Sequence, residues 1–332
     1  MSKFTQPDDL TLELLAQTGD SDPMVASAAQ YKFVKAINMP LRDAILAGDI
    51  VSNIFAATQL PRGANPEWPL DILNPGDEDD YVAFVIPGNG RIPEKSIEGD
   101  YVTIPTYSIG NSINLLLRHV RDANWNIMER ALQVMQAGFV KKINDDGWRT
   151  LLGAAADRNI LVYDADASAG QFTKRLVSLM KVVMRRNGGG NSASLKRRKL
   201  TDLYLSPEAL EDIRNWGLDQ VDEVTRREIY TAADGGVTRV FNVNLHDIDE
   251  LGVGQQYQNF FTSSLGGTMA ASDLEIVVGL DLQNPDFVMP VRESLSIFPD
   301  PMMHRTQQVG YYGWLEGGFA CLDNRNVILG SI

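Results

Sequence analysis

Residues 122–156 read DANWNIMERALQVMQAGFVKKINDDGWRTLLGAAA, and the rest of the chain is organised around this stretch. Its large apolar residues recur at steps of three and four, a spacing that places them on one stripe of a helix: Trp125, Met128, Leu132, Met135, Phe139 and Ile143. Asp122 or Asn124 can cap the start and no proline interrupts the run, so we predict a helix about 45 Å long at roughly 1.5 Å per residue. Considered alone, such a helix is most often a core helix of an enzyme.

Two glycines interrupt the apolar pattern of this helix. Gly138 and Gly147 each lower its stability by about 1 kcal/mol relative to alanine. We therefore expect a neighbouring element to approach closely at these positions, or the helix to bend near residues 144–147.

Composition describes a folded protein of one large or two modest domains. The chain has 332 residues, of which 44% are apolar and 8% aromatic. No apolar run approaches the ~18 residues of a membrane helix, and the N-terminus lacks the apolar region of a signal peptide, so we expect a cytosolic protein. The single cysteine, Cys321, excludes internal disulfides and multi-cysteine metal sites, and its apolar neighbours predict a buried side chain.

Charge is distributed unevenly along the chain. The net charge of −13 argues against a dedicated duplex-DNA binder, because such proteins must neutralise phosphates. Basic and acidic side chains number 7 and 16 in residues 1–100, 16 and 7 in residues 101–200, and 7 and 20 in residues 201–332. Identical copies that meet head to tail could pair the basic middle of one with an acidic flank of the next.

The first third of the chain reads as an arm followed by an extended hairpin. Helical patterns cover residues 8–17 and 24–36, and a third segment starts at Pro40 and ends at residues 60–63. Residues 64–80 are a loop that ends in four acids, Asp77–Asp80, which are either a solvated turn or part of a metal site. Two β-rich runs, 81–86 and 101–105, surround a Pro/Gly/Asn turn and predict a hairpin, which residues 108–121 join to the long helix.

The middle of the chain predicts a second amphipathic helix over residues 171–186, with these apolar side chains inward: Phe172, Leu176, Leu179 and Val182 or Val183. The loop 187–199 closes with four basic residues, which either contact phosphates or form a solvated or subunit-facing patch. Residues 201–205 read as a strand, and Ser206-Pro207-Glu208 opens a helix over 209–216 as cap, first-turn proline and first-turn acid.

The remainder is mostly β, with strands predicted over 237–243, 274–280, 288–291, 309–316, 319–322 and 327–329. Residues 323–326 read as a hairpin turn that joins the last two strands.

Catalytic and ligand-binding motifs are missing from the sequence. There is no P-loop, and residues 252–257 lack the third glycine of a dinucleotide fingerprint. The calcium-loop pattern from Asp164 fails at its sixth and twelfth positions. His119, His246 and His304 lack metal-ligand spacing, and Ser178 with Lys181 suits an ordinary helix. We therefore predict no catalytic, cofactor or metal site, although folding can assemble a site from distant residues.

The order of these elements resembles the Hong Kong 97-type fold of tailed-phage major capsid proteins, which encapsulins share. The resemblance is one of order and length rather than of a signature motif. Its carriers are LRDAILAG at 41–48, the extended loop 81–105, the spine helix 122–156, the axial segment 201–213, and GYYGWLEGGFA at 310–320 through Ile332.

The resemblance implies an α+β fold with an N-terminal arm, an extended β-hairpin loop, a long spine helix, and peripheral and axial domains. The corresponding segments are the arm 1–60, the loop and flanking strands 61–110, the peripheral domain 111–186 with its spine helix, the mainly axial domain 187–280, and peripheral-domain strands 281–332.

The function that the resemblance implies is structural and not enzymatic. Copies of the chain would assemble into pentamers and hexamers of an icosahedral phage head around double-stranded DNA, without cofactor, membrane or sequence-specific DNA binding. Further expected partners are separate scaffolding and portal proteins, with decoration proteins as an open question. The expected location is the virion, after assembly in the host cytoplasm.

We expect contacts between copies at the tip of the extended loop and at basic side chains of the middle segment. These residues are Pro87, Gly88, Asn89, Gly90, Arg91, Lys95, Lys141, Lys142, Arg149, Lys196, Arg197, Arg198 and Lys199.

Two alternatives stay open from sequence. One is an encapsulin-like nanocompartment shell, and the other is a soluble α+β enzyme with a metal held by Asp77–Asp80 and further carboxylates. Some proteins of the capsid family crosslink a loop lysine to an asparagine of a neighbour. Lys95 with Asn324 or Asn326 fits that pattern, but a lysine at an extended edge ordinarily serves to discourage aggregation.

Overall fold

A computed structural model describes residues 9–20, 22–48, 51–61, 63–69, 101–122, 125–168, 170–187, 198–216, 239–265, 275–284, 286–300 and 306–332. The chain forms two compact units. The first comprises Met1–Pro66, Thr103–Gly147 and Val288–Ala320, and the second comprises Glu67–Val102, Trp148–Phe287 and Cys321–Ile332.

The first unit is built on a long sheet with the strand order β1-β10-β11-β4. These strands are β1 (Ala56–Gln59), β10 (Phe287–Asp300), β11 (Gln308–Gly317) and β4 (Tyr107–Leu116), and β12 (Ala320–Cys321) also pairs with β10. β1 runs parallel to β10, whereas β10, β11 and β4 are antiparallel. Alternation along β11 points Val309, Tyr311 and Leu315 into the core of this unit.

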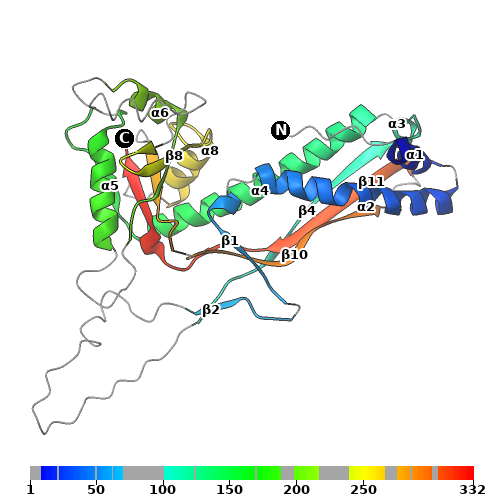
Figure 1. Cartoon of the computed structure of the whole chain (residues 1–332), viewed down its shortest axis with the longest axis horizontal. Helices are drawn as coiled ribbons and strands as arrows, with labels where there is room; N and C mark the ends of the chain where they lie inside the picture. The colour runs from blue at the N-terminus through cyan, green and yellow to red at the C-terminus, as the bar shows by residue number, and fades with distance from the viewer. Residues whose placement is uncertain are drawn as a thin grey trace, which may run out of the picture. The chain divides into compact units, whose positions relative to one another are not determined.

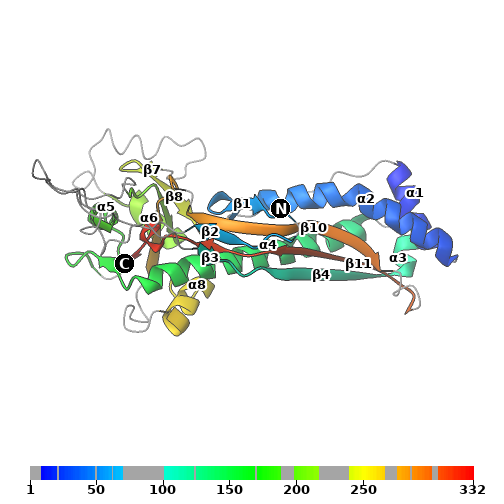
Figure 2. The same cartoon turned by 90° about the horizontal axis from the view of Figure 1, so that it is seen from below.

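The predicted long helix is α4 (Trp125–Asp157), a single run of 33 residues. Its apolar stripe is buried as predicted, at Met128, Leu132, Met135, Phe139 and Ile143. Figures 1 and 2 both show β4, β10 and β11 running alongside the first part of α4. The stripe and the inward face of the sheet therefore make one hydrophobic core.

The two glycines of α4 are sites of close approach, and the helix continues without a break through residues 144–147. A Cβ on Gly138 would lie 2.6 Å from Nδ2 of Asn111, and one on Gly147 would lie 2.3 Å from Cγ1 of Val51. A larger residue would push the Asn111 side chain aside at the first position, and at the second it would displace Val51 of the turn η1 (Val51–Asn53).

The helices of the arm differ from the prediction at Pro40. After α1 (Asp9–Gln17), a single helix α2 (Pro23–Gly48) runs through this proline. A proline inside a helix costs one hydrogen bond but does not by itself end the helix when the pattern continues on both sides. Phe33 of α2 packs on Tyr311 of β11, with 5.9 Å between ring centroids.

One prediction about the first unit is wrong, and one predicted strand is present but longer than expected. Residues 108–121 are not a simple connection but form most of the ten-residue strand β4 and the short helix α3 (Leu117–Arg121). The strand predicted over 288–291 extends to Asp300 as β10. In both cases, pairing with β11 keeps polar sequence in a strand, and in β4 this sequence also includes Gly110.

The second unit is built on a six-stranded sheet with the order β5-β13-β9-β6-β8-β7. Its strands are β5 (Leu161–Tyr163), β13 (Val327–Ser331), β9 (Ile276–Leu280), β6 (Asp202–Leu205), β8 (Val243–Asp247) and β7 (Arg239–Val240). In the described ranges, the last part of α4 accompanies this sheet, together with α5 (Lys174–Asn187), α6 (Pro207–Arg214), α8 (Gln256–Phe260) and η3 (Phe261–Leu265). β9 and β13 are buried at every position, as expected for central strands covered on both faces.

Helix α5 buries a different stripe from the predicted one. The buried side chains are Leu176, Val177, Met180 and Met184, whereas Leu179 and Val183 are half-buried and Val182 is 49% exposed. Met180 turns toward the sheet, where a Cβ on Gly279 would lie 3.1 Å from its Cε and one on Gly330 would lie 2.8 Å from its Sδ. Ser206 caps α6 as predicted, since its Oγ accepts a hydrogen bond from the backbone N–H of Ala209 at 3.1 Å.

The C-terminal strands do not form the predicted hairpin. β12 pairs with β10, whereas β13 pairs with β9 and β5 in the other sheet. Residues 324–326 form a single helical turn capped by Asp323, whose carboxylate accepts from the backbone N–H of Arg325. The predicted strand 237–243 is likewise divided into β7 and β8 by Phe241 and Asn242, which both have positive φ.

The unit boundaries also differ from the predicted segments, because α5 and β13 pack with the second unit. Of the extended loop, the described parts are β2 (Glu67–Pro69) and β3 (Tyr101–Thr103), which pair with each other. None of the helices in the described ranges has the length and apolarity that crossing a bilayer requires.

Candidate assembly surfaces

The predicted contact residues fall into two groups. Pro87, Gly88, Asn89, Gly90, Arg91, Lys95, Lys196 and Arg197 lie outside the described residues, as do Asp77–Asp80 of the metal alternative. Lys141, Lys142, Arg149, Arg198 and Lys199 are described and differ in their surroundings.

Lys141 and Lys142 lie on the exposed side of α4, behind the buried Phe139. The Lys142 ammonium is 2.7 Å from the Asp146 carboxylate, one turn further on. The Tyr107 hydroxyl of β4 donates to the same carboxylate at 2.7 Å. Burial, together with the bond to Asp146 and its charge, raises the pKa of Tyr107 well above its ordinary value. This face of α4 thus presents an ion pair beside β4, which is the last strand of the sheet among the described residues.

Arg149, also exposed, lies in the second unit, and its guanidinium carbon is 5.2 Å from the ring centroid of Phe260. This distance is within the range of a cation–π interaction. The contact holds Arg149 against α8.

Arg198 is not a surface residue, contrary to the prediction of a polar loop through 199. Its side chain is 1% exposed and pairs with Asp286 at 3.2 Å and with Asp323. Arg325 donates to Asp323, and Asn326 donates to Asp286 at 2.6 Å. Burial alone would raise the pKa of the Asp323 carboxyl, but the hydrogen bonds from Arg325 and the charges of Arg198 and Arg325 lower it overall. Arg198 therefore belongs to an internal network of the second unit.

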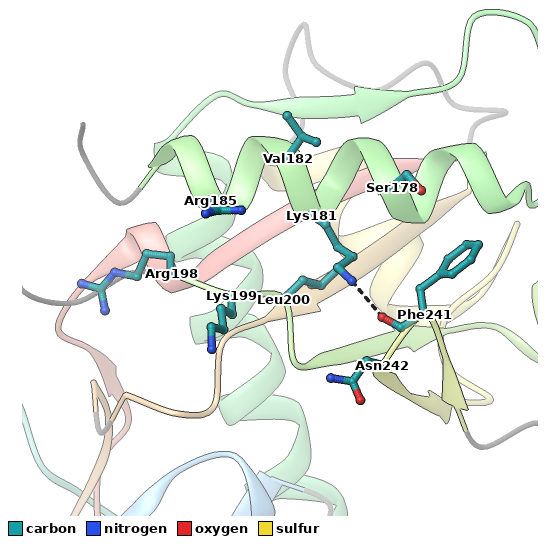
Figure 3. Close-up of a pocket in the computed structure, with 9 residues that line it drawn as sticks. All are labelled: Ser178, Lys181, Val182, Arg185, Arg198, Lys199, Leu200, Phe241 and Asn242. Carbon is teal, nitrogen blue, oxygen red and sulfur yellow. Dashed lines mark hydrogen bonds between the residues drawn. The ribbon is translucent and has the colours of Figure 1, made fainter. Parts of the chain in front are cut away.

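A cavity of about 560 Å³ opens beside α5 in the second unit (Figure 3). It is lined by Ser178, Lys181, Val182 and Arg185 of α5, by Arg198, Lys199 and Leu200 before β6, and by Phe241 and Asn242 between β7 and β8. Figure 3 shows the Arg198 side chain pointing away from the other cations. Lys181 donates to the carbonyl oxygen of Phe241 at 2.8 Å, so α5 holds the β7–β8 turn.

An exposed aromatic group occupies the other face of the long sheet in the first unit. Phe298, Tyr312 and Trp314 stack with ring centroids 4.7–5.8 Å apart. Alternation along β11 sends these rings away from the core, since Tyr311 and Leu315 point into it. The alternating pattern of residues 309–316 predicts which side chains share a face of the strand. It does not predict which of the two faces is buried.

His246 is placed by hydrogen bonding and stacking. Its Nε2 is 2.9 Å from Oδ1 of Asp202, and its ring stacks on Tyr204 at 4.7 Å. Tyr204 in turn packs edge-on against Trp148 of α4. These contacts give His246 a structural role in the second unit.

Comparisons with solved structures identify proteins of the same architecture. A structure of Microbacterium phage Oxtober96 has a TM-score of 0.58 and 9% identity, covering 86% of this chain and 90% of that chain. The capsid of an empty GTA particle has a TM-score of 0.52 and 10% identity, covering 86% and 90%. The Cyanophage Pam1 capsid asymmetric unit has a TM-score of 0.53 and 13% identity, covering 84% and 88%.

At these identities the likeness establishes a shared fold. No protein-family model and no curated protein matches the sequence. The shared fold extends over more than four fifths of the chain and includes both units.

Proposed function

We propose that this chain, whose fold is the Hong Kong 97-type capsid fold, is the major capsid protein of a tailed phage. The observation that carries the proposal is the likeness to phage capsid structures along nearly the whole chain. The likeness covers 84–86% of the chain in these three structures. No observation favours the encapsulin-like shell or the metal-dependent enzyme.

In this proposal the first unit is the peripheral domain and the second is the axial domain. The spine helix α4 contributes its first part to one core and its last part to the other, since Phe139 belongs to the first unit and Trp148 packs in the second.

Copies of the chain would associate as pentamers and hexamers through heterologous contacts, in which different surfaces of the subunit meet. The extended loop around residues 87–95 and the exposed side of α4 at Lys141 and Lys142 are the proposed contact regions. Arg149 and Lys199 are further candidates, because both side chains are exposed.

The role of the assembled shell would be to enclose double-stranded DNA without reading its sequence. The net charge of −13 supports this, because an acidic shell lets packaged DNA move without adhering to it. The protein would have no enzymatic activity of its own. It would be located in the virion after assembly in the host cytoplasm, with separate scaffolding and portal proteins as further partners.

Negative-stain electron microscopy of the purified protein tests the proposal. We expect capsomer rings or closed particles. A preparation that stays monomeric or dimeric at every concentration and salt condition would overturn it.

A further inference from the structure

The cavity beside α5 is basic, and its cations are available to a ligand. Arg198 is already neutralised by Asp286 and Asp323, which leaves Lys181, Arg185 and Lys199. None of the described residues that line the cavity is acidic. Arg185 and Lys199 are exposed, and neither forms an ion pair with a described residue.

The rim of this cavity is apolar. Val182 on α5 is 49% exposed and Phe241 in the β7–β8 turn is 42% exposed. The bond from Lys181 to the carbonyl oxygen of Phe241 fixes the turn relative to α5. A ligand for this site should therefore combine negative charge with a small apolar group.

A loop of the same unit has these properties, but it lies at the opposite end of the sheet. β6 and β8 are parallel, with Asp202 opposite Asn244 and Leu205 opposite Asp247. The cavity lies where the two strands begin, next to Leu200 and Asn242, and the loop 247–254 follows where they end. The separation along the strands is about 15 Å, at roughly 3.3 Å per residue.

This strand-end loop (residues 247–254) is acidic and carries one exposed apolar side chain. Asp247, Asp249 and Glu250 are exposed, and the exposed Glu208 of α6 lies beside the loop, since a Cβ on Gly252 would be 3.5 Å from its Oε2. None of these four carboxylates forms an ion pair with a described residue. Val253 is 61% exposed.

The loop is held in one conformation. Gly252 and Gly254 have φ of 120° and 79°, which a residue with a side chain rarely adopts. The Asn259 side chain donates to the carbonyl oxygen of Gly254 at 2.9 Å, and the backbone N–H of Tyr257 donates to the carbonyl oxygen of Glu250 at 3.0 Å. A loop ordered in advance loses little conformational entropy on binding.

We infer that the basic cavity of one copy binds the acidic strand-end loop of the next copy. Carboxylates meet Arg185 and Lys199, and Val253 packs on Val182 and Phe241. The inference rests on the proposed function, and it adds which surface of one copy meets which surface of the next. Because cavity and loop lie at opposite ends of the same two strands, the contact is heterologous, and repetition of it about a symmetry axis closes a ring.

A nucleic acid is the other polyanion to consider for a basic cavity. The strand-end loop is the better match, because it supplies charge and an apolar anchor together, one per copy. A phosphate backbone has no counterpart to the exposed Val182 and Phe241 rim.

Charge exchange tests the inference. The double variant Arg185→Glu with Lys199→Glu reverses the charge of the cavity. The double variant Asp249→Lys with Glu250→Lys reverses the charge of the loop, and a fourfold variant carries all four substitutions. We expect each double variant to lose assembly by at least about tenfold, because like charges now face each other, and the fourfold variant to recover it. The charge-preserving control Arg185→Lys with Lys199→Arg should assemble as the unmodified chain does. Circular dichroism and thermal melting check that every variant is folded.

A mixture of the two double variants adds a geometric readout. In a ring where the two double variants alternate, opposite charges meet at every contact between neighbours. Strict alternation needs an even number of subunits, so it is possible in a six-membered ring but not in a five-membered one. Electron microscopy of the mixture should show hexameric rings and lack pentameric ones.

The outcomes separate the inference from the proposed function. If the unmodified chain forms no rings or particles, the proposed function fails. If it assembles and both folded double variants assemble equally well, the inference is overturned. The inference is also overturned if the fourfold variant does not recover, or if the cavity variant assembles normally and loses only binding to a duplex DNA probe.

Discussion

Gly147 of α4 lies directly against Val51: a Cβ on the glycine would be 2.3 Å from Cγ1 and 2.9 Å from Cγ2 of the valine. Val51 is fully buried, and its backbone N–H is 3.4 Å from Oδ1 of Asn144 on the same helix. The arm therefore docks on the spine helix at a position where only a glycine leaves room.

The first prediction follows from this contact. Gly147→Ala gains up to about 1 kcal/mol of helix propensity but forces a clash that costs ~1–3 kcal/mol, so we expect a net loss of stability. Gly153→Ala in the same helix is the matched control, because a Cβ there meets nothing within 4 Å. Urea unfolding of the unassembled subunit should show Gly153→Ala as neutral or stabilising. Equal stability changes for the two variants would contradict the close approach.

The buried and exposed faces of α4 should respond differently to substitution. Phe139 is 1% exposed, and even Phe139→Ala should cost about 3–5 kcal/mol, so Phe139→Asp should prevent folding. Reversal of Lys141 and Lys142 to Glu should leave the subunit folded, since an exposed i,i+4 ion pair contributes only about 0.3–0.5 kcal/mol. We expect the folded double reversal to assemble poorly in sedimentation assays. Normal assembly would exclude this face of the helix as a contact.

The buried Arg198 should be needed for the stability of the second unit. Arg198→Ala leaves Asp286 and Asp323 without their shared cation, and breaking a buried pair in this way costs ~3–5 kcal/mol. Lys199→Ala, at the adjacent exposed position, should stay within about 0.5 kcal/mol. Thermal melting of the unassembled subunit measures the stability change of each variant. A small effect of Arg198→Ala would show that the hydrogen bonds from Arg325 and Asn326 are enough to stabilise the buried carboxylates of Asp323 and Asp286.

Glu275 should make stability depend on pH. Burial raises the pKa of this carboxyl above its ordinary 4.5, the Ser206 hydroxyl opposes the shift, and the charges of Glu208 and Asp212 add to it. Below pH 4.5 the carboxyl is protonated in both states and the full stability is present. As the pH rises, the unfolded chain ionises first, so stability is lost through the higher pKa of the folded state.

Glu275→Gln removes this titration and keeps an oxygen that can accept the Ser206 hydrogen bond. The melting temperature of the variant relative to the unmodified chain should rise between pH 4 and pH 8. A difference that is constant with pH would exclude Glu275 as the source.

Much of the first core could be predicted because its signal is local. The 3.6-residue period of residues 125–157 sets both the helix and its buried stripe, and Ser206-Pro207-Glu208 sets the start of α6. The strand β4 was missed because Gly110, Asn111 and Ser112 interrupt its apolar alternation, and only pairing with β11 shows that it is a strand.

The candidate site depended on contacts between distant residues. Arg198 pairs with acids 88 and 125 positions away, so a local basic run gave no sign of its burial. The strands on either side of residues 323–326 likewise pair with distant strands, since β12 pairs with β10 and β13 belongs to the six-stranded sheet. A local turn pattern could not show this. Similarly, the cavity forms only where α5, the residues before β6 and the β7–β8 turn meet, and these segments are distant in the sequence.

Electron microscopy of the purified protein shows whether the chain assembles as a capsid subunit. Class averages should show rings of five and six subunits or closed icosahedral particles, with both units of each subunit in the Hong Kong 97-type arrangement. A protein that remains a monomer or a dimer at every concentration and ionic strength would contradict the account.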